Sequence, residues 1–572
     1  MKNNTRIILL EHPRHINPKK LQDVVNTPLS SCLMTDYIAS VLKSKNLDVE
    51  IVDANLYEWS FHKTVQELKE KSFNVLGVHL VYLWEDTEDI FKMLLNIRRN
   101  CVNVHTNLYG HFPTFAFREI LSKYPFVDSI TVGEPEITFL KLAKAVINKK
   151  DTSTLYTIDG LAFKTSHSNT NLPLSAFVKS SMHPPFTKGG EGGLKGICSR
   201  VLEGEIEKYS LEKHGILNSK IEEDVLKTDV IQNKPRKPIS KLDELPFPYR
   251  HDFKLLKQKG IATYILASRG CYGECTFCYL DQFYGETSYW RGRSPENIVD
   301  ELYYLCEDYG ERYFYFADAN FFGPGKKGKE RACEIARLIK GKDLKINFGI
   351  ECRVNDIEDA SIGKLVEAGL NDVFLGIESG NNSSLNRFKK FTTVEDNKKA
   401  INILRKYGIE PNYGFIMFEP YSTLEDVRGN YEFLKEMKML RVPSVTAHLL
   451  HHRQTIFKGT PDYQKRKSLA KSVSRLNYEY ICNFKDERVA DFAESIRSFC
   501  LEVLEGLSKD RDFKREQNSC FYDEDDSLSK NINEKLIEHF ERALSSFENK
   551  EDNRLLFAGK GAKDAKNSER FI

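Results

Sequence analysis

Three cysteines stand within eight residues near the middle of the 572-residue chain. In the stretch RGCYGECTFCYL they are Cys271, Cys275 and Cys278, which gives the spacing C-x3-C-x2-C. Clustered thiolates bind zinc or an iron–sulfur centre. Zinc needs a fourth close ligand, and the neighbouring residues offer Glu274 and Asp281 but no histidine. An iron–sulfur cube normally takes four thiolates, so three of them indicate one iron left open for a substrate or a second cofactor.

The bulk composition is that of an ordinary globular protein, with 41% hydrophobic and 29% charged residues. A formal net charge of +2 gives no signature of nucleic-acid binding. Twelve cysteines are too few for a disulfide scaffold, and those outside the cluster are typical of small buried hydrophobic residues. Residues 75–84, the longest strongly apolar stretch, reach about half a membrane span. Because the N-terminus also lacks a signal-peptide core, we expect a cytoplasmic protein without a membrane span.

The first part of the chain, residues 1–150, alternates strand and helix patterns. Apolar runs typical of buried strands cover residues 6–11, 48–55, 74–83, 102–108 and 127–134. A helical pattern follows each of them, which predicts a doubly wound, Rossmann-like α/β sheet. Such sheets bind ligands beyond the carboxyl ends of their strands. The alternative is that these turns are ordinary loops of a structural domain. The candidate ligand contacts there are Tyr82, Gly110, His111, Gly133 and Glu134.

A second alternation of strands and helices begins after residue 256. The strand-like segments are residues 262–268, 312–318, 345–351, 372–378, 411–418 and 444–450. Six such repeats predict a partial (β/α)6 barrel of the TIM type, in which the chemistry lies at the carboxyl ends of the strands. The three cysteines follow the first of these strands directly, so they fall at that edge.

The whole chain therefore divides into four predicted parts. Residues 1–150 form the α/β domain, and residues 151–255 form a linker with a flexible glycine- and proline-rich insertion at 180–196. Residues 256–450 form the partial barrel. Residues 451–572 form a mainly helical C-terminal region on the substrate side, with a frayed tail.

The cysteine motif, with the aromatic Phe277 before its third cysteine, resembles the signature of the radical S-adenosylmethionine (radical SAM) superfamily. Further stretches resemble successive strand-end motifs of its class B-type methyltransferase branch, namely residues 289–302, 316–323, 350–357, 373–393 and 414–427. That branch carries an N-terminal cobalamin-binding domain, to which the first 150 residues are similar. Residues 237–253 also resemble its interdomain linker.

The resemblance implies that the three cysteines ligate a [4Fe-4S] cluster and that SAM chelates the fourth iron. An electron from an external donor such as flavodoxin or ferredoxin would then split SAM to a 5′-deoxyadenosyl radical. Polar residues implied to hold SAM lie at the later strand ends: Asp318 and Asn320, Glu351 and Arg353, and Glu378 and Ser379. Capping of a helix or pairing with a neighbour is the alternative for each of them. Arg291 and Arg293 are expected to be salt-bridge partners.

Cobalamin rests on the resemblance alone, because none of the fourteen histidines has the Asp-x-His pattern of many cobalt ligands. The implied activity is methyl transfer to an unactivated carbon, or to a phosphinate phosphorus, of a small metabolite, lipid or peptide. One alternative is cyclisation or rearrangement without methyl transfer. Another is a methylthiotransferase, for which Cys32 and Cys101 are the available N-terminal thiols. A third is a non-enzymatic iron–sulfur electron carrier.

Overall fold

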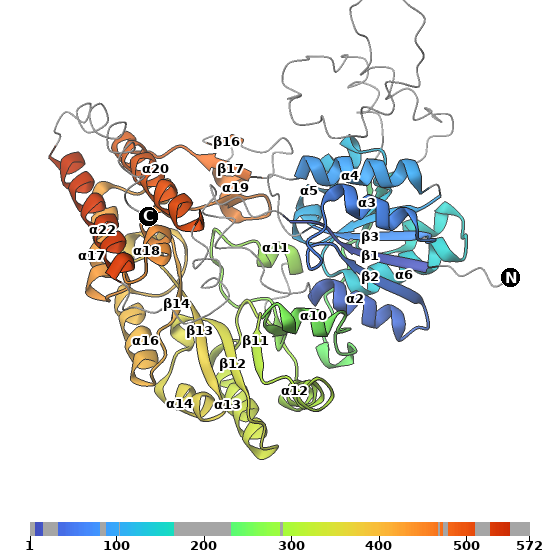
Figure 1. The fold of residues 1–572 in the computed structure, drawn as a ribbon, viewed down its shortest axis with the longest axis horizontal. Coiled ribbons are helices and arrows are strands. Elements are labelled where there is room, and N and C mark those ends of the chain that lie inside the picture. The colour runs from blue at the N-terminus through green and yellow to red at the C-terminus, as the bar shows by residue number, and fades with distance from the viewer. Residues whose placement is uncertain are drawn as a thin grey trace, which may run out of the picture.

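The computed structural model of the chain shows two sheets built mainly of parallel strands and a helical C-terminal region (Figure 1). The structure describes residues 6–14, 33–80, 87–101, 103–164, 230–285, 290–466, 470–472, 479–509 and 527–549. No described helix is long and apolar enough to cross a membrane.

The N-terminal sheet has seven strands in the order β2-β1-β3-β4-β5-β6-β7. The five strands expected in the first 150 residues are present and parallel: β1 (Arg6–Glu11), β2 (Asp48–Asp53), β3 (Val75–His79), β4 (His105–Tyr109) and β5 (Ser129–Thr131). Alternate residues of β1 enter separate cores on the two faces of the sheet, Ile8 and Leu10 on one side and Ile7 and Leu9 on the other. This explains why its apolar run is continuous.

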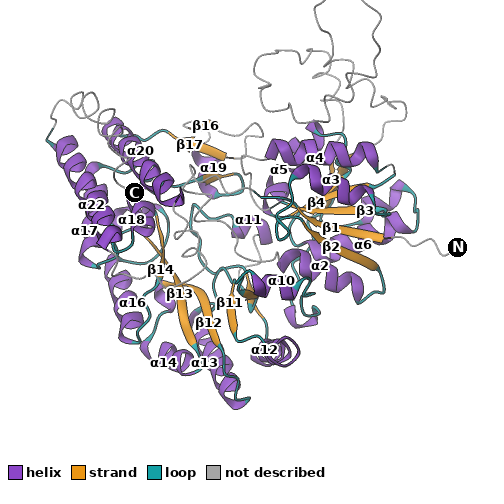
Figure 2. Cartoon of the chain, in the orientation of Figure 1, coloured by secondary structure: helices purple, strands orange, loops and turns teal. Residues whose placement is uncertain are grey.

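Helices cover each face of this sheet (Figure 2). One face packs against α3 (Phe61–Lys69), α4 (Thr87–Asn100) and α5 (His111–Lys123). The opposite face packs against α2 (Leu33–Lys43) and α6 (Pro135–Ile147). The sheet is therefore doubly wound, as the sequence predicts.

Two short strands that the sequence analysis did not predict extend this sheet. They are β6 (Leu161–Lys164) and β7 (Val230–Gln232), which pair antiparallel with β5 and with each other. Both come from the stretch expected to be a linker. Runs of only four and three residues carry too little periodicity to be recognised. The glycine- and proline-rich insertion at 180–196 lies outside the described residues.

The second sheet has five parallel strands in the order β14-β13-β12-β11-β8. They are β8 (Thr263–Ile265), β11 (Tyr313–Phe316), β12 (Asn347–Arg353), β13 (Leu370–Glu378) and β14 (Asn412–Phe415). Their outer face is buried against α12 (Pro295–Tyr309), α13 (Gly325–Gly341), α14 (Asp359–Glu367) and α16 (Val394–Lys406). The inner face is less covered, since Phe374 in the middle of β13 is 36% exposed.

The prediction of a sixth barrel strand at residues 444–450 is wrong. This segment lies in a helix, α18 (Pro443–His451), which starts with a proline at a position that favours helix initiation. A short apolar run does not distinguish a strand from a buried helix. Beside β14, the described chain forms only a single parallel bridge, between Phe418 and Arg453.

The C-terminal region packs on α18. Two long helices, α20 (Glu487–Lys509) and α22 (Ser527–Glu548), contact it and each other, and α22 also contacts α17 (Leu424–Glu436). Three short strands form a separate antiparallel sheet in the order β15-β17-β16: β15 (Ile456–Phe457), β17 (Glu479–Cys482) and β16 (Ala470–Ser472).

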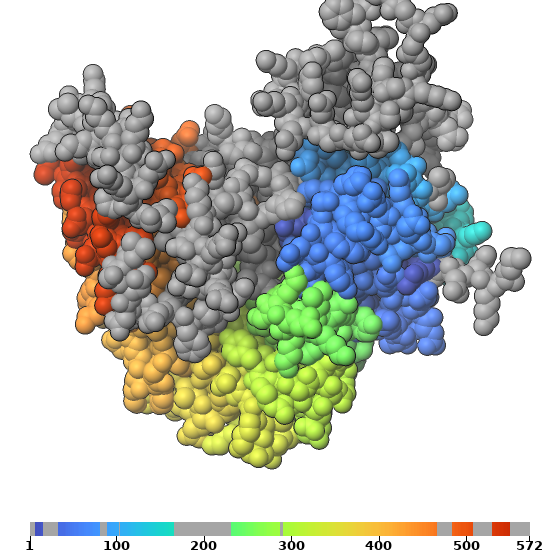
Figure 3. Space-filling model, in the orientation of Figure 1, coloured from blue at the N-terminus to red at the C-terminus, as the bar shows by residue number. Residues whose placement is uncertain are grey.

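The segment around α10 (Phe253–Gln258) lies against the N-terminal domain (Figure 3). His251, which precedes this helix, is buried. Its Nδ1 lies 2.8 Å from an oxygen of Asp36, and its Nε2 lies 3.2 Å from an oxygen of Asp53. Burial alone lowers the pKa of His251, but hydrogen bonds and charges from the two carboxylates raise it to about 10. The adjacent Arg250 donates to Glu301 on α12 at 2.8 Å. Residues 250–251 thus tie the N-terminal domain to the barrel.

Replacement of His251 by glutamine is expected to destabilise the protein by about 3–5 kcal/mol, because it leaves two buried carboxylates without their cation. The folded-state pKa of His251 lies above 6.5, its ordinary value. Its stabilising effect is therefore complete below pH 6.5 and is lost as the pH rises through about 10. Urea unfolding should show the gap between wild type and His251→Gln shrinking over that range.

The matched control is His62→Gln, since His62 is exposed on α3. This variant should unfold like the wild type at every pH. A gap for His251→Gln that is constant or grows from pH 6.5 to pH 10 would contradict a charged His251.

Candidate functional site

The cysteine loop (residues 270–279) leaves the carboxyl edge of the second sheet. Its base is fixed by the antiparallel pair β9 (Ser268–Arg269) and β10 (Arg291–Gly292). Cys275 is buried, and Cys271 and Cys278 are half-buried. Burial raises the pKa of Cys271 and of Cys278, so their thiolates form readily only where a positive charge compensates them. A metal centre supplies such a charge.

The thiol arrangement is compatible with a [4Fe-4S] cluster, in which each thiolate binds a different iron. The three cysteines lie on one loop, and beyond the effect of burial Cys275 and Cys271 both act electrostatically to raise the pKa of Cys278. The three sulfur atoms are therefore near one another.

Arg353 at the end of β12 holds the loop from the barrel side. Its Nη1 donates to Cys275 Sγ at 3.3 Å, and its Nη2 donates to the carbonyl of Lys390. A Cβ at Gly273 would collide with Nη1, so a glycine is needed for this close approach. A cationic donor stabilises a thiolate and hydrogen-bonds to the sulfur of a bound cluster.

Thr276 connects the loop to two other segments. Its backbone N–H donates to the Phe388 carbonyl at 3.0 Å, and its hydroxyl donates to Asp462 Oδ2 at 3.0 Å. The Asp462 N–H donates back to the Thr276 carbonyl at 3.0 Å, from the start of α19 (Pro461–Arg466). The predicted Phe277 packs edge-on against Phe388, with ring centroids 5.3 Å apart. The barrel and the C-terminal region therefore hold the loop together.

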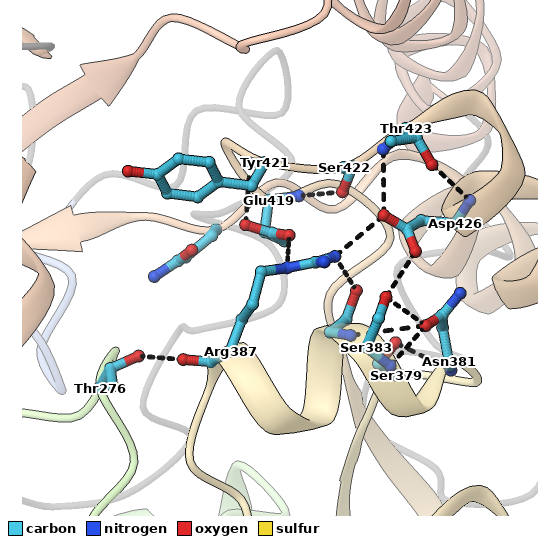
Figure 4. Close-up of polar contacts among 12 residues, drawn as sticks. Thr276, Ser379, Asn381, Ser383, Arg387, Glu419, Tyr421, Ser422, Thr423 and Asp426 are labelled. Atoms are coloured by element: carbon cyan, nitrogen blue, oxygen red, sulfur yellow. Dashed lines mark hydrogen bonds and ion pairs between the residues drawn. The ribbon is translucent and has the colours of Figure 1, made fainter.

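The segment that receives Thr276 is itself anchored by a polar network (Figure 4). Arg387 ends α15 (Asn382–Arg387) and pairs with Glu419 at 2.5 Å and with Asp426 at 2.9 Å. Asp426 also belongs to the capping box of α17, where it accepts the N–H of Thr423 at 3.1 Å. This network fixes the backbone that immediately precedes Phe388.

The N-terminal domain contacts the same loop. The predicted His111 opens α5, and its ring lies against Tyr279 and Phe283, with centroids 4.8 and 4.3 Å away. Phe283 belongs to α11 (Leu280–Tyr284). Gly133, another predicted contact, lies close to it, because a Cβ added at Gly133 would be 3.3 Å from the Phe283 carbonyl oxygen. Burial lowers the pKa of His111 to about 3, so its imidazole is neutral. The carboxyl edge of the N-terminal sheet thus faces the cysteine loop.

The other N-terminal candidates have structural roles or lie outside the described residues. Glu134 is buried and accepts hydrogen bonds from Arg291 at 2.7 Å and Arg269 at 3.2 Å. Burial opposes ionisation of Glu134, but these two arginines lower its pKa overall. A Cβ at Gly110 would collide with the Leu80 carbonyl. Tyr82 lies outside the described residues.

The expectation that Arg291 and Arg293 are salt-bridge partners is confirmed. Arg291 bridges to Glu134 of the N-terminal domain, and Arg293 pairs with Glu301 on α12 at 2.5 Å. Because Glu301 also receives Arg250, one buried carboxylate joins the interdomain segment to the barrel.

Three of the residues predicted to hold SAM, Asp318, Asn320 and Ser379, are fully buried and hydrogen-bonded to protein groups. Burial raises the pKa of Asp318 to about 6. The partners are Ser268 and Ala267 for Asp318, Asp356 and Gly323 for Asn320, and Asn430 and Asn381 for Ser379. These contacts favour a structural role behind the site for all three.

The other predicted residues, Glu351 and Glu378, lie with Arg353 toward the inner face of the barrel. Burial, with the charge of Asp318, raises the pKa of Glu351 to about 8. Glu378 adopts a left-handed backbone (φ 66°), which is strained for this residue type and typical of functional sites.

The sequence analysis missed Lys390, whose Nζ lies 2.8 Å from Glu378 Oε1. Lys390 is buried, whereas its neighbour Lys389 is exposed. Nothing in the sequence distinguishes these two lysines. Thr276 lies inside the recognised motif, but its partner Asp462 had no local signal either.

Comparison with known proteins finds a family match in the barrel region. Residues 265–434 match the profile of the radical SAM superfamily. An uncharacterised methyltransferase of Pyrococcus horikoshii is 24% identical over 76% of this chain and 78% of its own length. An anaerobic magnesium-protoporphyrin IX monomethyl ester cyclase of Cereibacter sphaeroides is 25% identical over 69% of this chain but only 55% of the cyclase.

A solved structure extends the likeness to the whole fold. The cobalamin-dependent S-adenosylmethionine radical enzyme OxsB, solved with aqua-cobalamin and S-adenosylmethionine bound, superposes with a TM-score of 0.63. The two sequences are 17% identical, and the match covers 100% of this chain and 84% of OxsB. Together with the cysteine motif that follows the first barrel strand, these matches show that residues 265–434 form a radical SAM superfamily domain and that the chain has the fold of OxsB.

Proposed function

We propose that the protein is a cobalamin-dependent radical SAM methyltransferase. The observation that carries this proposal is the meeting of two ligand-binding edges. The carboxyl ends of the N-terminal strands face the cysteine loop through the contacts of His111 with Tyr279 and Phe283. In doubly wound sheets and in barrels alike, ligands bind at the carboxyl ends of the strands. Two cofactors bound there would lie on either side of one shared space.

Cys271, Cys275 and Cys278 would hold a [4Fe-4S] cluster at this edge, with Arg353 donating to Cys275. When bound, the cluster and SAM together supply a radical able to remove a hydrogen atom from an unactivated centre. The role of the chain is to fix the thiols, orient SAM and exclude water. Glu351, Arg353 and Glu378 are the proposed SAM contacts, while Asp318, Asn320 and Ser379 support them from behind.

Cobalamin would bind at the N-terminal edge, near Gly110, His111 and Gly133. The aqua-cobalamin bound in the OxsB structure supports this assignment, as does the direct packing of the edge on the cysteine loop. His111 is neutral and half-buried, but its ring packs on aromatic side chains, which favours a role as a spacer between the two cofactors. No residue is proposed as the lower ligand of cobalt. The substrate is a small molecule, lipid or peptide, and the electron comes from an external donor.

Cys275→Ala is expected to abolish reductive cleavage of SAM, because the cluster then loses one of its three protein ligands. The measurement is 5′-deoxyadenosine formed by anaerobically reconstituted enzyme with dithionite and SAM. Cys333→Ala on α13 is the control, and it should retain wild-type turnover. Formation of 5′-deoxyadenosine by Cys275→Ala at the wild-type rate would show that the thiol is not a ligand.

Reconstitution with hydroxocobalamin should give a protein that retains the corrin through gel filtration, seen in its visible spectrum. With methyl-labelled SAM, the reduced protein is then expected to transfer label to the bound corrin. Retention of corrin without transfer of label would favour the alternative of cyclisation or rearrangement, the activity named for the Cereibacter sphaeroides relative. Failure to retain corrin would exclude cobalamin while leaving the radical SAM chemistry intact.

A further inference from the structure

A buried ion pair lies on the inner face of the barrel, beside the cysteine loop. Lys390 is 3% exposed, and its ammonium contacts Glu378 Oε1 at 2.8 Å. Both charged atoms lie 2.9 Å from the position that a Cβ would occupy on Gly376. Because Gly376 has no side chain, the pair sits directly over the β13 backbone. Gly376 is in register with Arg353, so the pair lies next to the strand end whose arginine binds Cys275.

The backbone around Lys390 is built to hold this ammonium in place. Lys389 and Phe391, the residues on either side, both adopt left-handed conformations with φ of 53° and 56°. Such conformations are unfavourable in non-glycine residues and persist only where the surroundings impose them. The Lys390 N–H donates to Leu385 at 3.0 Å, and the Lys390 carbonyl accepts from Arg353. The turn therefore directs Lys390 inward while its neighbour Lys389 remains exposed.

Lys390 is connected to the cysteine loop through Arg353. The Arg353 guanidinium donates through Nη1 to Cys275 Sγ at 3.3 Å and through Nη2 to the Lys390 carbonyl. The Glu378 carboxylate lies 2.8 Å from the Lys390 ammonium, so its charge opposes that of the ammonium at any nearby group.

We propose that Lys390 and Glu378 set the reduction potential of the cluster, Lys390 by stabilising the electron that the cluster accepts and Glu378 by opposing it. This inference rests on the proposed function, since it requires the cluster. One electron from the reductant enters the cluster, and no bond or proton changes at either side chain. The potential of an iron–sulfur cluster depends on its net charge, its hydrogen bonds and its exposure. A fixed charge nearby in a medium of low dielectric constant acts in the same way.

The two charges have opposite signs, so their removal must have opposite effects. Lys390→Met leaves the carboxylate uncompensated and should lower the midpoint potential. Glu378→Gln unmasks the ammonium and should raise it. A nearby unit charge in a medium of low dielectric constant changes the ratio of reduced to oxidised cluster by on the order of tenfold. For a one-electron couple, a tenfold change corresponds to about 59 mV in the midpoint potential. The double variant should return close to the wild type, because it removes one positive and one negative charge and leaves the local net charge unchanged.

The measurement is a redox titration of the reconstituted enzyme without SAM, followed by the EPR signal of the reduced cluster. Lys389→Met is the control, because it removes the adjacent exposed lysine and should leave the potential unchanged. Lys390→Arg keeps the charge and should titrate like the wild type, which separates loss of charge from loss of packing. Single variants that leave the potential unchanged, or that both shift it in one direction, would overturn the proposal.

The same titration distinguishes this inference from the function on which it rests. If the wild-type protein binds about four irons and gives the EPR signal of a reduced [4Fe-4S] cluster, the cluster that the proposed function requires is present whatever the variants do. Absence of that signal in the wild type would instead refute the function itself.

Discussion

The cysteine loop is held in place by side chains from every part of the chain that the structure describes. The barrel contributes Arg353, which donates to a thiol, and the carbonyl of Phe388. The C-terminal region contributes Asp462, and the N-terminal domain contributes His111. A loop with three partly buried thiols would be costly to order without such contacts, because burial disfavours their ionised form. The position of the loop therefore depends on how the domains are joined.

Two buried ionic networks join the domains. His251 lies between two carboxylates of the N-terminal domain, and Glu134 accepts arginines from the strand pair at the base of the cysteine loop. Buried ion pairs add little to stability compared with well-packed apolar residues, but they fix relative position because each charge needs its partner. In this protein they set the carboxyl edge of one sheet against that of the other, which is the arrangement that two neighbouring cofactors require.

Much of the fold is evident from the sequence, because long apolar runs and helical periodicity are local signals. The five parallel strands of the N-terminal domain and the first five barrel strands lie where they are expected. The prediction of a sixth strand was wrong because the segment at 444–450 is short and apolar, a pattern that strands share with buried helices. The proline before this segment favours a helix. The added strands β6 and β7 were missed because they gain stability only by pairing with β5.

In the candidate site too, residues with a local sequence signal could be predicted and residues that depend on long-range contacts could not. The cysteines are recognisable by spacing, and Arg353 by its place at a strand end. Asp318 was also selected by its place at a strand end, yet its carboxylate is used by the backbone of Ala267. Lys390 and Asp462 depend on long-range contacts, which a single sequence does not reveal. Type and position thus indicate which residues are near the site, whereas burial and partners decide what each one does.

The central claim is that the protein leaves one iron of its cluster open and that SAM binds there. Electron–nuclear double resonance on the reduced cluster, with SAM labelled with ¹⁵N at its amino group, tests this directly. We expect a ¹⁵N hyperfine coupling that appears on addition of labelled SAM and is replaced by a ¹⁴N coupling when unlabelled SAM displaces it. A cluster signal that is unchanged by SAM, or a metal centre with a full set of protein ligands, would contradict the account.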